Sequence, residues 1–191
     1  MRPSNEQRRT QLTDAAIAVV VRDGLHGLTH RAVDEAANVP RGTTSNYYRS
    51  RDALLEATTR RLMDLHFALM KRKRPPAQKL DRRVLNQFVS GVLEHALNQH
   101  PGRYLAMLEL ALQSTRDPQL KHALVGLTGE AMQHTSDVHE ADNVLSDKAI
   151  QLLSVFYNGI LFTCLVMPEI LGGRTPGEIT RDGLEKLLSL N

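Results

Sequence analysis

A run of short polar side chains beside several arginines is the part of this sequence best suited to contacting nucleic acid. Residues 43–46 are Thr-Thr-Ser-Asn, and such side chains on a helix can reach base edges in a major groove about 12 Å wide. Neighbouring arginines would bind phosphates, which position the protein and supply salt-dependent affinity. A threonine at a helix N-terminus can bind a phosphate too. We therefore predict that DNA is contacted by Thr29, Arg31, Arg41, Thr43, Thr44, Ser45, Asn46, Tyr47 and Arg51.

The residue pattern gives little support to metal or catalytic chemistry. His95 and His100 are five residues apart, as are His134 and His139, whereas two metal ligands on one helix face need a spacing of four. The single cysteine, Cys164, lies in an apolar stretch and reads as a small buried hydrophobe. The sequence contains neither a glycine-rich phosphate loop nor a Gly-x-Ser-x-Gly elbow. It therefore predicts no metal site, no cofactor and no enzymatic activity.

Charge is unevenly distributed along the chain. The whole sequence has 24 Lys and Arg against 21 Asp and Glu, a net charge of +3. Residues 1–74 hold 14 of the basic and eight of the acidic side chains, a net charge of +6, which leaves −3 for residues 75–191. A basic head on a slightly acidic body suggests that the head meets a polyanion, although chance variation in surface charge explains the counts equally well.

Helical periodicity dominates the N-terminal third. Apolar residues at helical spacing predict a first helix, which Gly24 ends, and Thr29 caps a second short helix. The turn Asn38–Gly42 breaks the pattern, and a third helix follows at about 41–48. The inward-facing residues of the first two helices are Leu12, Ala15, Ala16, Val19 and Val20, and then Val33, Ala36 and Ala37. This spacing predicts a helix-turn-helix in residues 1–50, followed by a connecting helix over 50–74.

The stretch from Leu12 to about Glu56 resembles the DNA-binding domain of the TetR family of bacterial transcriptional regulators. The resemblance rests on Ala15-Ala16, Gly24, Leu28-Thr29, Ala36-Ala37, Val39-Pro40-Arg41-Gly42-Thr43, Tyr47-Tyr48 and Ser50-Arg51-Asp52-Ala53-Leu54. Asn38 replaces a usual glycine, Ser45 a common tyrosine and Arg51 a usual lysine. The resemblance implies DNA binding, with Tyr47 directed towards DNA and Tyr48 packed inward.

Pro75-Pro76 predict the boundary to a larger helical domain at 75–191, and the chain as a whole is predicted to be all-α. The resemblance implies dimerisation through the last two helices and an effector inside a helix bundle. The residues suited to the dimer interface are Val155, Phe156, Gly159, Ile160, Thr163, Leu184, Leu187 and Leu188. Those suited to an effector pocket are Phe88, Val92, Tyr104, Met107, Leu108, Gln113, Asn158 and Phe162. Ordinary core packing remains the alternative for each of them.

The effector itself is expected to be small and apolar or aliphatic, because aromatic residues make up only 4% of the sequence and no tryptophan is present. Glu109 and Gln113 share a helix face and would hydrogen-bond either a ligand or a neighbouring helix. Ala149–Met167 is uncharged and long enough for a membrane span, but its polar residues favour a buried helix, so no membrane is expected. One cysteine and a polar N-terminus predict a cytoplasmic protein.

These observations together predict a homodimeric, effector-responsive repressor that binds a palindromic DNA operator. Two alternatives from other classes stay open. One is a small-molecule-binding protein or enzyme whose helix-turn-helix is incidental. The other is an architectural DNA binder that responds to no ligand.

Overall fold

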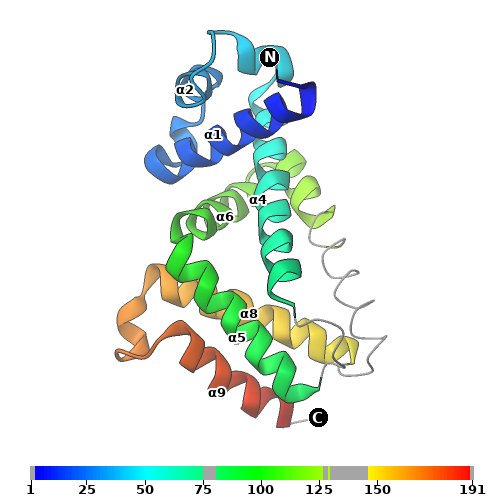
Figure 1. The fold of residues 1–191 in the computed structure, drawn as a ribbon, viewed down its shortest axis with the longest axis vertical. Coiled ribbons are helices and arrows are strands. Elements are labelled where there is room, and N and C mark those ends of the chain that lie inside the picture. The colour runs from blue at the N-terminus through cyan, green and yellow to red at the C-terminus, as the bar shows by residue number, and fades with distance from the viewer. Residues whose placement is uncertain (1–2, 75–80, 127–128, 130–145, 190–191) are drawn as a thin grey trace. The chain divides into compact units, whose positions relative to one another are not determined.

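The computed structural model describes residues 3–74, 81–126, 129 and 146–189. Helices dominate these residues and no strand occurs among them, which confirms the predicted all-α class. Figure 1 traces the helices from the N-terminus in blue to the C-terminus in red. They are α1 (Asn5–Gly27), α2 (His30–Ala36), α3 (Thr43–Tyr47), α4 (Arg51–Lys73), α5 (Arg82–Gln99), α6 (Pro101–Ser114), a helix at 118–126, α8 (Asp147–Val166), the 3-10 helix η1 (Pro168–Leu171) and α9 (Pro176–Ser189).

The chain forms two compact units. Unit 1 comprises Met1–Phe67 and Leu105–Leu127, and unit 2 comprises Ala68–Tyr104 and Thr128–Asn191. The sequence placed the boundary between residues 74 and 75, whereas the packing assigns most of α6 and the helix at 118–126 to the same unit as the helix-turn-helix. α4 and α6 each contribute residues to both units.

The first helix of unit 1 is defined at both ends. At its start the Ser4 hydroxyl accepts from the Gln7 N–H while the Gln7 side chain accepts from the Ser4 N–H, which satisfies two of the free helix donors. Near its end Gly24 has φ +73°, a conformation that favours glycine, and the helix kinks there. The N–H of Leu25, beyond the kink, donates to Oε2 of Glu109 on α6 at 2.9 Å. Glu109 therefore serves the second of its two predicted roles and joins neighbouring helices.

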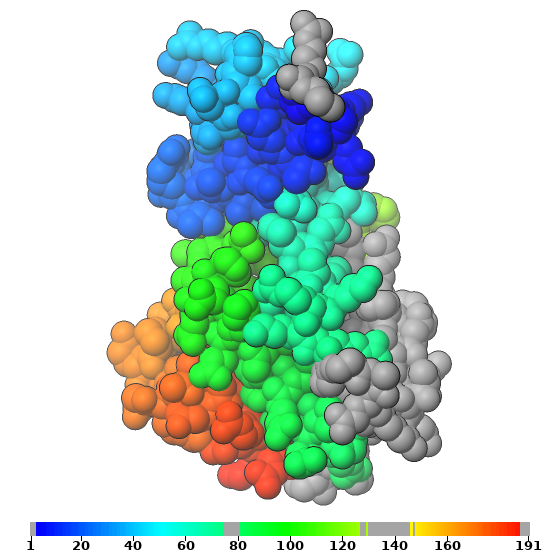
Figure 2. Space-filling model, viewed as in Figure 1, coloured from blue at the N-terminus to red at the C-terminus, as the bar shows by residue number. Residues whose placement is uncertain are grey.

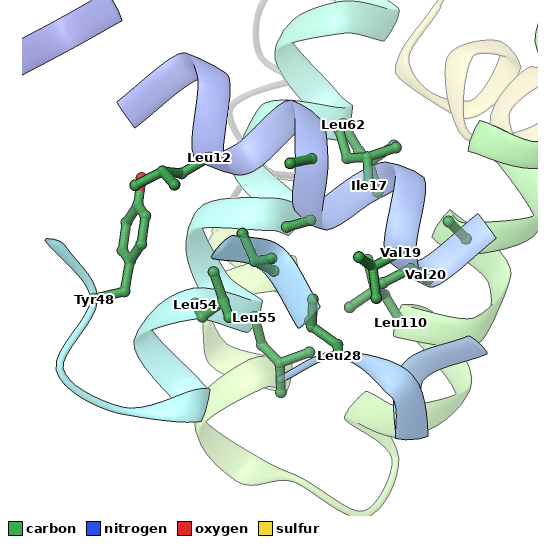
Figure 3. Packing of buried hydrophobic residues seen from close by; sticks show 14 of the residues in the cluster. Leu12, Ile17, Val19, Val20, Leu28, Tyr48, Leu54, Leu55, Leu62 and Leu110 are labelled. Atoms are coloured by element: carbon green, nitrogen blue, oxygen red, sulfur yellow. The ribbon is translucent and has the colours of Figure 1, made fainter. Parts of the chain in front are cut away.

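The core of unit 1 combines α1, α2 and α4 with α6. Figure 3 shows Leu110 of α6 beside Val19 and Val20 of α1, and Tyr48 beside Leu12. The predicted inward stripe of α1 is buried as expected. On α2, however, Ala36 is exposed and the acidic Asp34 is buried in its place.

Unit 2 has a core between α5, α8 and α9. Leu85 and Val89 of α5 pack with Leu153 of α8 and Leu184 of α9. Figure 2 shows α9 in red lying along α5 in green. Close contact between α8 and α9 depends on Gly183, since a Cβ there would lie 2.3 Å from Cζ of Phe156.

Helix α8 is only partly covered by its own chain. Its Lys148–Val166 segment is long and apolar enough to cross a membrane, and 28% of the most apolar window is buried. Ile160 and Leu161 face the interior, whereas Leu152, Val155 and Phe162 are exposed. The helix was expected to be buried on several sides, and within this chain that expectation is met only in part.

Candidate nucleic-acid interface

The short helix α3 is held in place by a buried carboxylate on α2. Asp34 is 3% exposed, and its Oδ2 accepts from the Gly42 N–H while its Oδ1 accepts from the Thr44 N–H, both at 2.7 Å. The Thr44 hydroxyl also donates to Oδ1 at 2.6 Å. Gly42 is the N-cap residue of α3, with φ +87°. It has no side chain that could accept from the first N–H groups of the helix, so the Asp34 carboxylate serves as the cap. A five-residue helix cannot stabilise itself, and this carboxylate fixes its direction.

Those hydrogen bonds also determine the charge of Asp34. Burial opposes the ionised form, but the hydrogen bonds from Thr44 and Gly42 and the nearby His30 outweigh it, so the pKa of Asp34 lies below its usual value. The N-terminus of α3 therefore faces a negative charge, which its helix dipole favours.

Thr44 differs from its predicted role. Its side chain is 0% exposed and its hydroxyl is bonded to Asp34, so it faces the interior of unit 1 rather than a ligand outside. The physical reason is the hydrogen-bonding need of the buried carboxylate, which the hydroxyl meets. Thr44 is a positioning residue for α3.

The other polar residues of α3 lie towards solvent. Ser45 and Asn46 are exposed, Thr43 is half-buried, and Arg41 is exposed in the turn just before them. The hydroxyl of Thr43 donates to the Pro40 carbonyl at 2.5 Å, and that of Ser45 donates to the Gly42 carbonyl at 3.0 Å. These local bonds occupy both hydroxyls, whereas Asn46 presents an exposed amide side chain on α3.

Of the two tyrosines at the end of α3, Tyr48 packs inward as predicted, whereas Tyr47, predicted to point towards DNA, is packed against the core of unit 1. Tyr48 is buried, and Tyr47 is half-buried. The guanidinium of Arg9 on α1 lies 5.6 Å from the ring centre of Tyr47 and 5.5 Å from that of Tyr48. Such distances allow cation–π attraction, so Arg9 is held beside the two rings at the end of α3. The Tyr48 carbonyl lies 2.6 Å from Nε2 of His30, which ties the end of α3 back to α2.

The predicted phosphate-binding groups occupy exposed positions around α3. Arg31 and Arg51 are exposed, as is the neighbouring Arg49, and Thr29 caps α2 by accepting from the Ala32 N–H at 3.1 Å. One nitrogen of the Arg51 guanidinium already forms a hydrogen bond, because Nη2 donates to the Leu25 carbonyl at 2.8 Å. The remaining N–H groups of that guanidinium are available to an anion.

Sequence reasoning missed Asp34 and His30, the two α2 residues that fix α3. Asp34 sits beside the predicted apolar stripe, where a carboxylate reads as surface. Its position eight residues before Gly42 was the only available signal. Arg9 is likewise not among the residues predicted to contact DNA.

Two protein-family models match this chain. Residues 12–58 match the model of bacterial regulatory proteins of the tetR family, and residues 80–190 match the model of the tetracyclin repressor-like C-terminal domain. The second match alone covers more than half of the chain. The chain belongs to the TetR family.

Several TetR-family proteins are similar to this chain. The HTH-type transcriptional regulator BetI from Burkholderia cenocepacia (strain HI2424) is 34% identical over 116 residues, which are 61% of this chain and 59% of that protein. The aligned part thus spans less than two thirds of that relative's length. A solved TetR-family structure from Streptomyces coelicolor A3 matches with a TM-score of 0.75 and 24% identity, covering 95% of this chain and 98% of that one. The multidrug binding protein EbrR, complexed with ethidium, matches with a TM-score of 0.72 and 24% identity, covering 96% and 99%. At these identities the structures establish the fold alone.

The predicted effector residues of this TetR-family chain are divided between its two units. Met107, Leu108 and Gln113 belong to unit 1, and Phe88, Val92, Tyr104, Asn158 and Phe162 belong to unit 2. Val92 and Tyr104 are buried, whereas Asn158 and Phe162 are exposed. Asn158 donates to the Ser154 carbonyl of its own helix at 2.8 Å. The five residues in unit 2 therefore differ in burial, and their exposure does not identify them as the lining of one pocket.

The predicted dimer residues also differ in exposure. Val155 and Gly159 are exposed, Phe156, Thr163 and Leu187 are half-buried, and Leu188 lies outside the described side chains. Ile160 is buried at 9% exposure, and Leu184 is fully buried in the core of its own unit. The exposed members, Val155 and Gly159, lie on α8, whereas Leu184 belongs to the core of its own unit.

Proposed function

We propose that this TetR-family chain is a DNA-binding transcriptional regulator that represses transcription as a homodimer. The observation that carries the proposal is the Asp34-capped α3, whose outer face presents Ser45 and Asn46 beside exposed arginines. A short helix with polar residues outward and cations around it has the features needed for major-groove reading with phosphate anchoring. Arg9, held by the two tyrosines, adds a phosphate-binding group at the far end of α3.

Dimerisation follows from the same reasoning. One α3 of five residues reads few base pairs, whereas two copies related by a two-fold axis read a palindrome. In successive major grooves the two α3 helices would lie about 34–36 Å apart. The exposed apolar residues of α8, Leu152, Val155 and Phe162, supply a surface that a second chain would cover.

A small apolar effector bound in the C-terminal helices would regulate DNA binding. α4 and α6 contribute residues to both units, so a ligand that favours one arrangement of these helices would change the spacing of the two α3 helices. Such an effector acts only through its different affinity for the two arrangements. EbrR, described as a multidrug binding protein, is a structural neighbour in complex with a small ligand. A panel of small molecules, scored first by thermal shift and then by release of DNA, identifies the effector. If no compound releases DNA, the proposal of effector regulation is contradicted.

Selection from a random duplex library tests the proposal against its alternatives. We expect repeated rounds of binding to enrich one palindromic sequence. An architectural DNA binder would enrich none, and a protein with an incidental helix-turn-helix would retain no duplex at physiological salt. Either of these two results overturns the proposal.

A further inference from the structure

Five basic side chains of unit 2 converge where α4, α5 and α6 meet. Arg72 and Lys73 come from the last turn of α4, His95 comes from α5, His100 follows α5 as its C-cap, and Arg103 lies in the first turn of α6. All five belong to the same compact unit. We call them the basic cluster. None of them lies in unit 1, which contains the helix-turn-helix.

The two imidazoles form the centre of the basic cluster. Their ring centres are 6.3 Å apart in an edge-on arrangement, and both residues are half-buried. Nη2 of Arg72 lies 3.4 Å from Nε2 of His95. Because a guanidinium only donates, this contact requires a lone pair on Nε2 and thus a neutral His95.

The charges around the two rings are all positive. Partial burial together with Lys73 and Arg72 lowers the pKa of His95. Burial together with Arg103, His95 and Arg72 lowers that of His100. In the part of the chain that the structure describes, neither α8 nor α9 contributes a charged group to this environment, and no carboxylate acts on either ring.

The nearest acidic residue in sequence does not compensate the basic cluster. Glu94 precedes His95, but its Oε2 lies against Gly177 of α9, where an added Cβ would be only 2.5 Å away. The half-buried rings and the three cations therefore share a positive potential without a counter-charge among the described residues. A bound anion would offset the repulsion among these positive charges.

We propose that the basic cluster binds a small multivalent anion carrying a phosphate, sulfate or carboxylate group. Guanidinium and ammonium groups form short charge-assisted hydrogen bonds with such oxygens. The N-terminus of α6, beside His100 and Arg103, adds a favourable dipole. On binding, each imidazole gains a proton and donates to the anion, so Arg72 turns from His95 to the ligand. This site goes beyond the proposed DNA binding and does not depend on it.

Titration of the full chain with sodium sulfate tests the site by NMR. Sulfate stays a dianion from pH 5 to 8, so any pH dependence belongs to the protein, and sodium chloride keeps the ionic strength constant. The ring Cε1–H resonances of His95 and His100, assigned with His95→Gln and His100→Gln, are expected to shift saturably. Binding should tighten from pH 8 to pH 6, by up to about tenfold per pH unit for each proton taken up.

Arg72, in the last turn of α4, and Arg74, just after its end, provide a matched pair of variants. Arg72→Gln should weaken sulfate binding about tenfold or more, since it removes a charged hydrogen-bond donor. Arg74→Gln removes the same charge from an exposed position that acts on neither ring and should leave binding unchanged. Resonances of the other histidines report that each variant is folded.

Three results would overturn the proposal. The first is a shift that grows linearly with sulfate and never saturates, because it indicates general salt effects. Equal weakening in both arginine variants is the second, because it indicates diffuse screening. The third is a random-sequence duplex that shifts the same resonances at lower concentration than sulfate, because the cluster would then be a DNA contact.

Discussion

Asp34 accepts three hydrogen bonds, one from Gly42, the N-cap of α3, and two from Thr44 in its first turn, so the direction of the outward face of α3 depends on one carboxylate. At the other end of α3, Arg9 contacts the rings of the two tyrosines, and such contacts are weaker than hydrogen bonds to a buried carboxylate. The interface therefore has one strong anchor at the start of α3 and a weaker one at its end.

Replacing Asp34 by alanine should destabilise the protein and abolish specific DNA binding. Each buried donor left without a partner costs about 1–3 kcal/mol. Urea unfolding measures the loss, with Asp14→Ala as the control. Asp14 forms a partly exposed ion pair with Arg61, which is worth about 0–1 kcal/mol. Equal losses in the two variants would remove the special role given to Asp34.

Acid should remove the contribution of Asp34 in a defined pH window. The pKa of Asp34 in the folded chain lies below its ordinary value of 3.8, so between those two values the unfolded chain binds a proton that the folded chain does not. The stabilisation is complete above pH 3.8 and is lost as pH falls through the folded pKa. The difference in unfolding free energy between wild type and Asp34→Asn should therefore shrink with acid. A constant difference from pH 6 to pH 3 would contradict this.

At this scale the sequence predicted the type of surface better than the role of each residue. The polar run 43–46 and the inward Tyr48 followed from pattern and resemblance. Thr44 and Asp34 did not, because their burial exists only as a pair. A carboxylate beside an apolar stripe reads as surface until the hydroxyl and N–H groups that bond to it are known.

Among the elements, α1 and α6 are linked by a bond that local sequence does not encode. Glu109 accepts from the Leu25 N–H just past the kink, and Arg51 of α4 donates to the Leu25 carbonyl. Both backbone polar groups of Leu25, near the end of α1, are therefore bonded by side chains of other helices. The two predicted alternatives for Glu109 could not be separated by sequence, because the partner lies 84 residues away.

Glu109→Ala should free the end of α1. The Leu25 N–H loses its acceptor, so its hydrogen exchange should accelerate and stability should fall by about 1–3 kcal/mol. Glu109→Gln keeps an oxygen acceptor and should retain most of the protection. Unchanged exchange at Leu25 in Glu109→Ala would show that the bond contributes nothing.

Gly183→Ala should disturb the packing of α9 on α8. The new methyl group would overlap Phe156, and overpacking of this kind costs about 1–3 kcal/mol. Gly91→Ala, on α5 with open space around it, should instead stabilise the chain by about 0.5–1 kcal/mol. Thermal unfolding compares the two, and adding Phe156→Leu should recover part of the Gly183→Ala loss. No recovery would place the strain elsewhere.

For the whole molecule, the exposed apolar residues of α8 are the surface that a second chain would cover. Val155→Glu should shift the protein towards monomer in sedimentation velocity, because a charge at 71% exposed Val155 would be buried on association. Val125→Glu is the matched control, since Val125 is 62% exposed in unit 1. Unchanged sedimentation of Val155→Glu would remove α8 from the dimer interface.

The division into two units was the least predictable feature of the fold. Pro75-Pro76 marked a break in the chain, but the apolar residues of α6 indicated burial without indicating the partner. Their contact with Val19 and Val20 is a long-range packing outcome. The basic cluster was missed for a similar reason, because Lys71–Arg74 reads as a solvated helix end until His95 of α5 is found beside Arg72.

Fluorescence anisotropy with the selected palindrome tests the central claim most directly. The chain should bind this duplex far more tightly than a scrambled one, and affinity should fall steeply with salt. Asn46→Ala should lose about 1–3 kcal/mol of this discrimination, while Asn98→Ala, an exposed position on α5, should lose none. Equal affinity of wild type for the palindrome and its scrambled form would contradict the account.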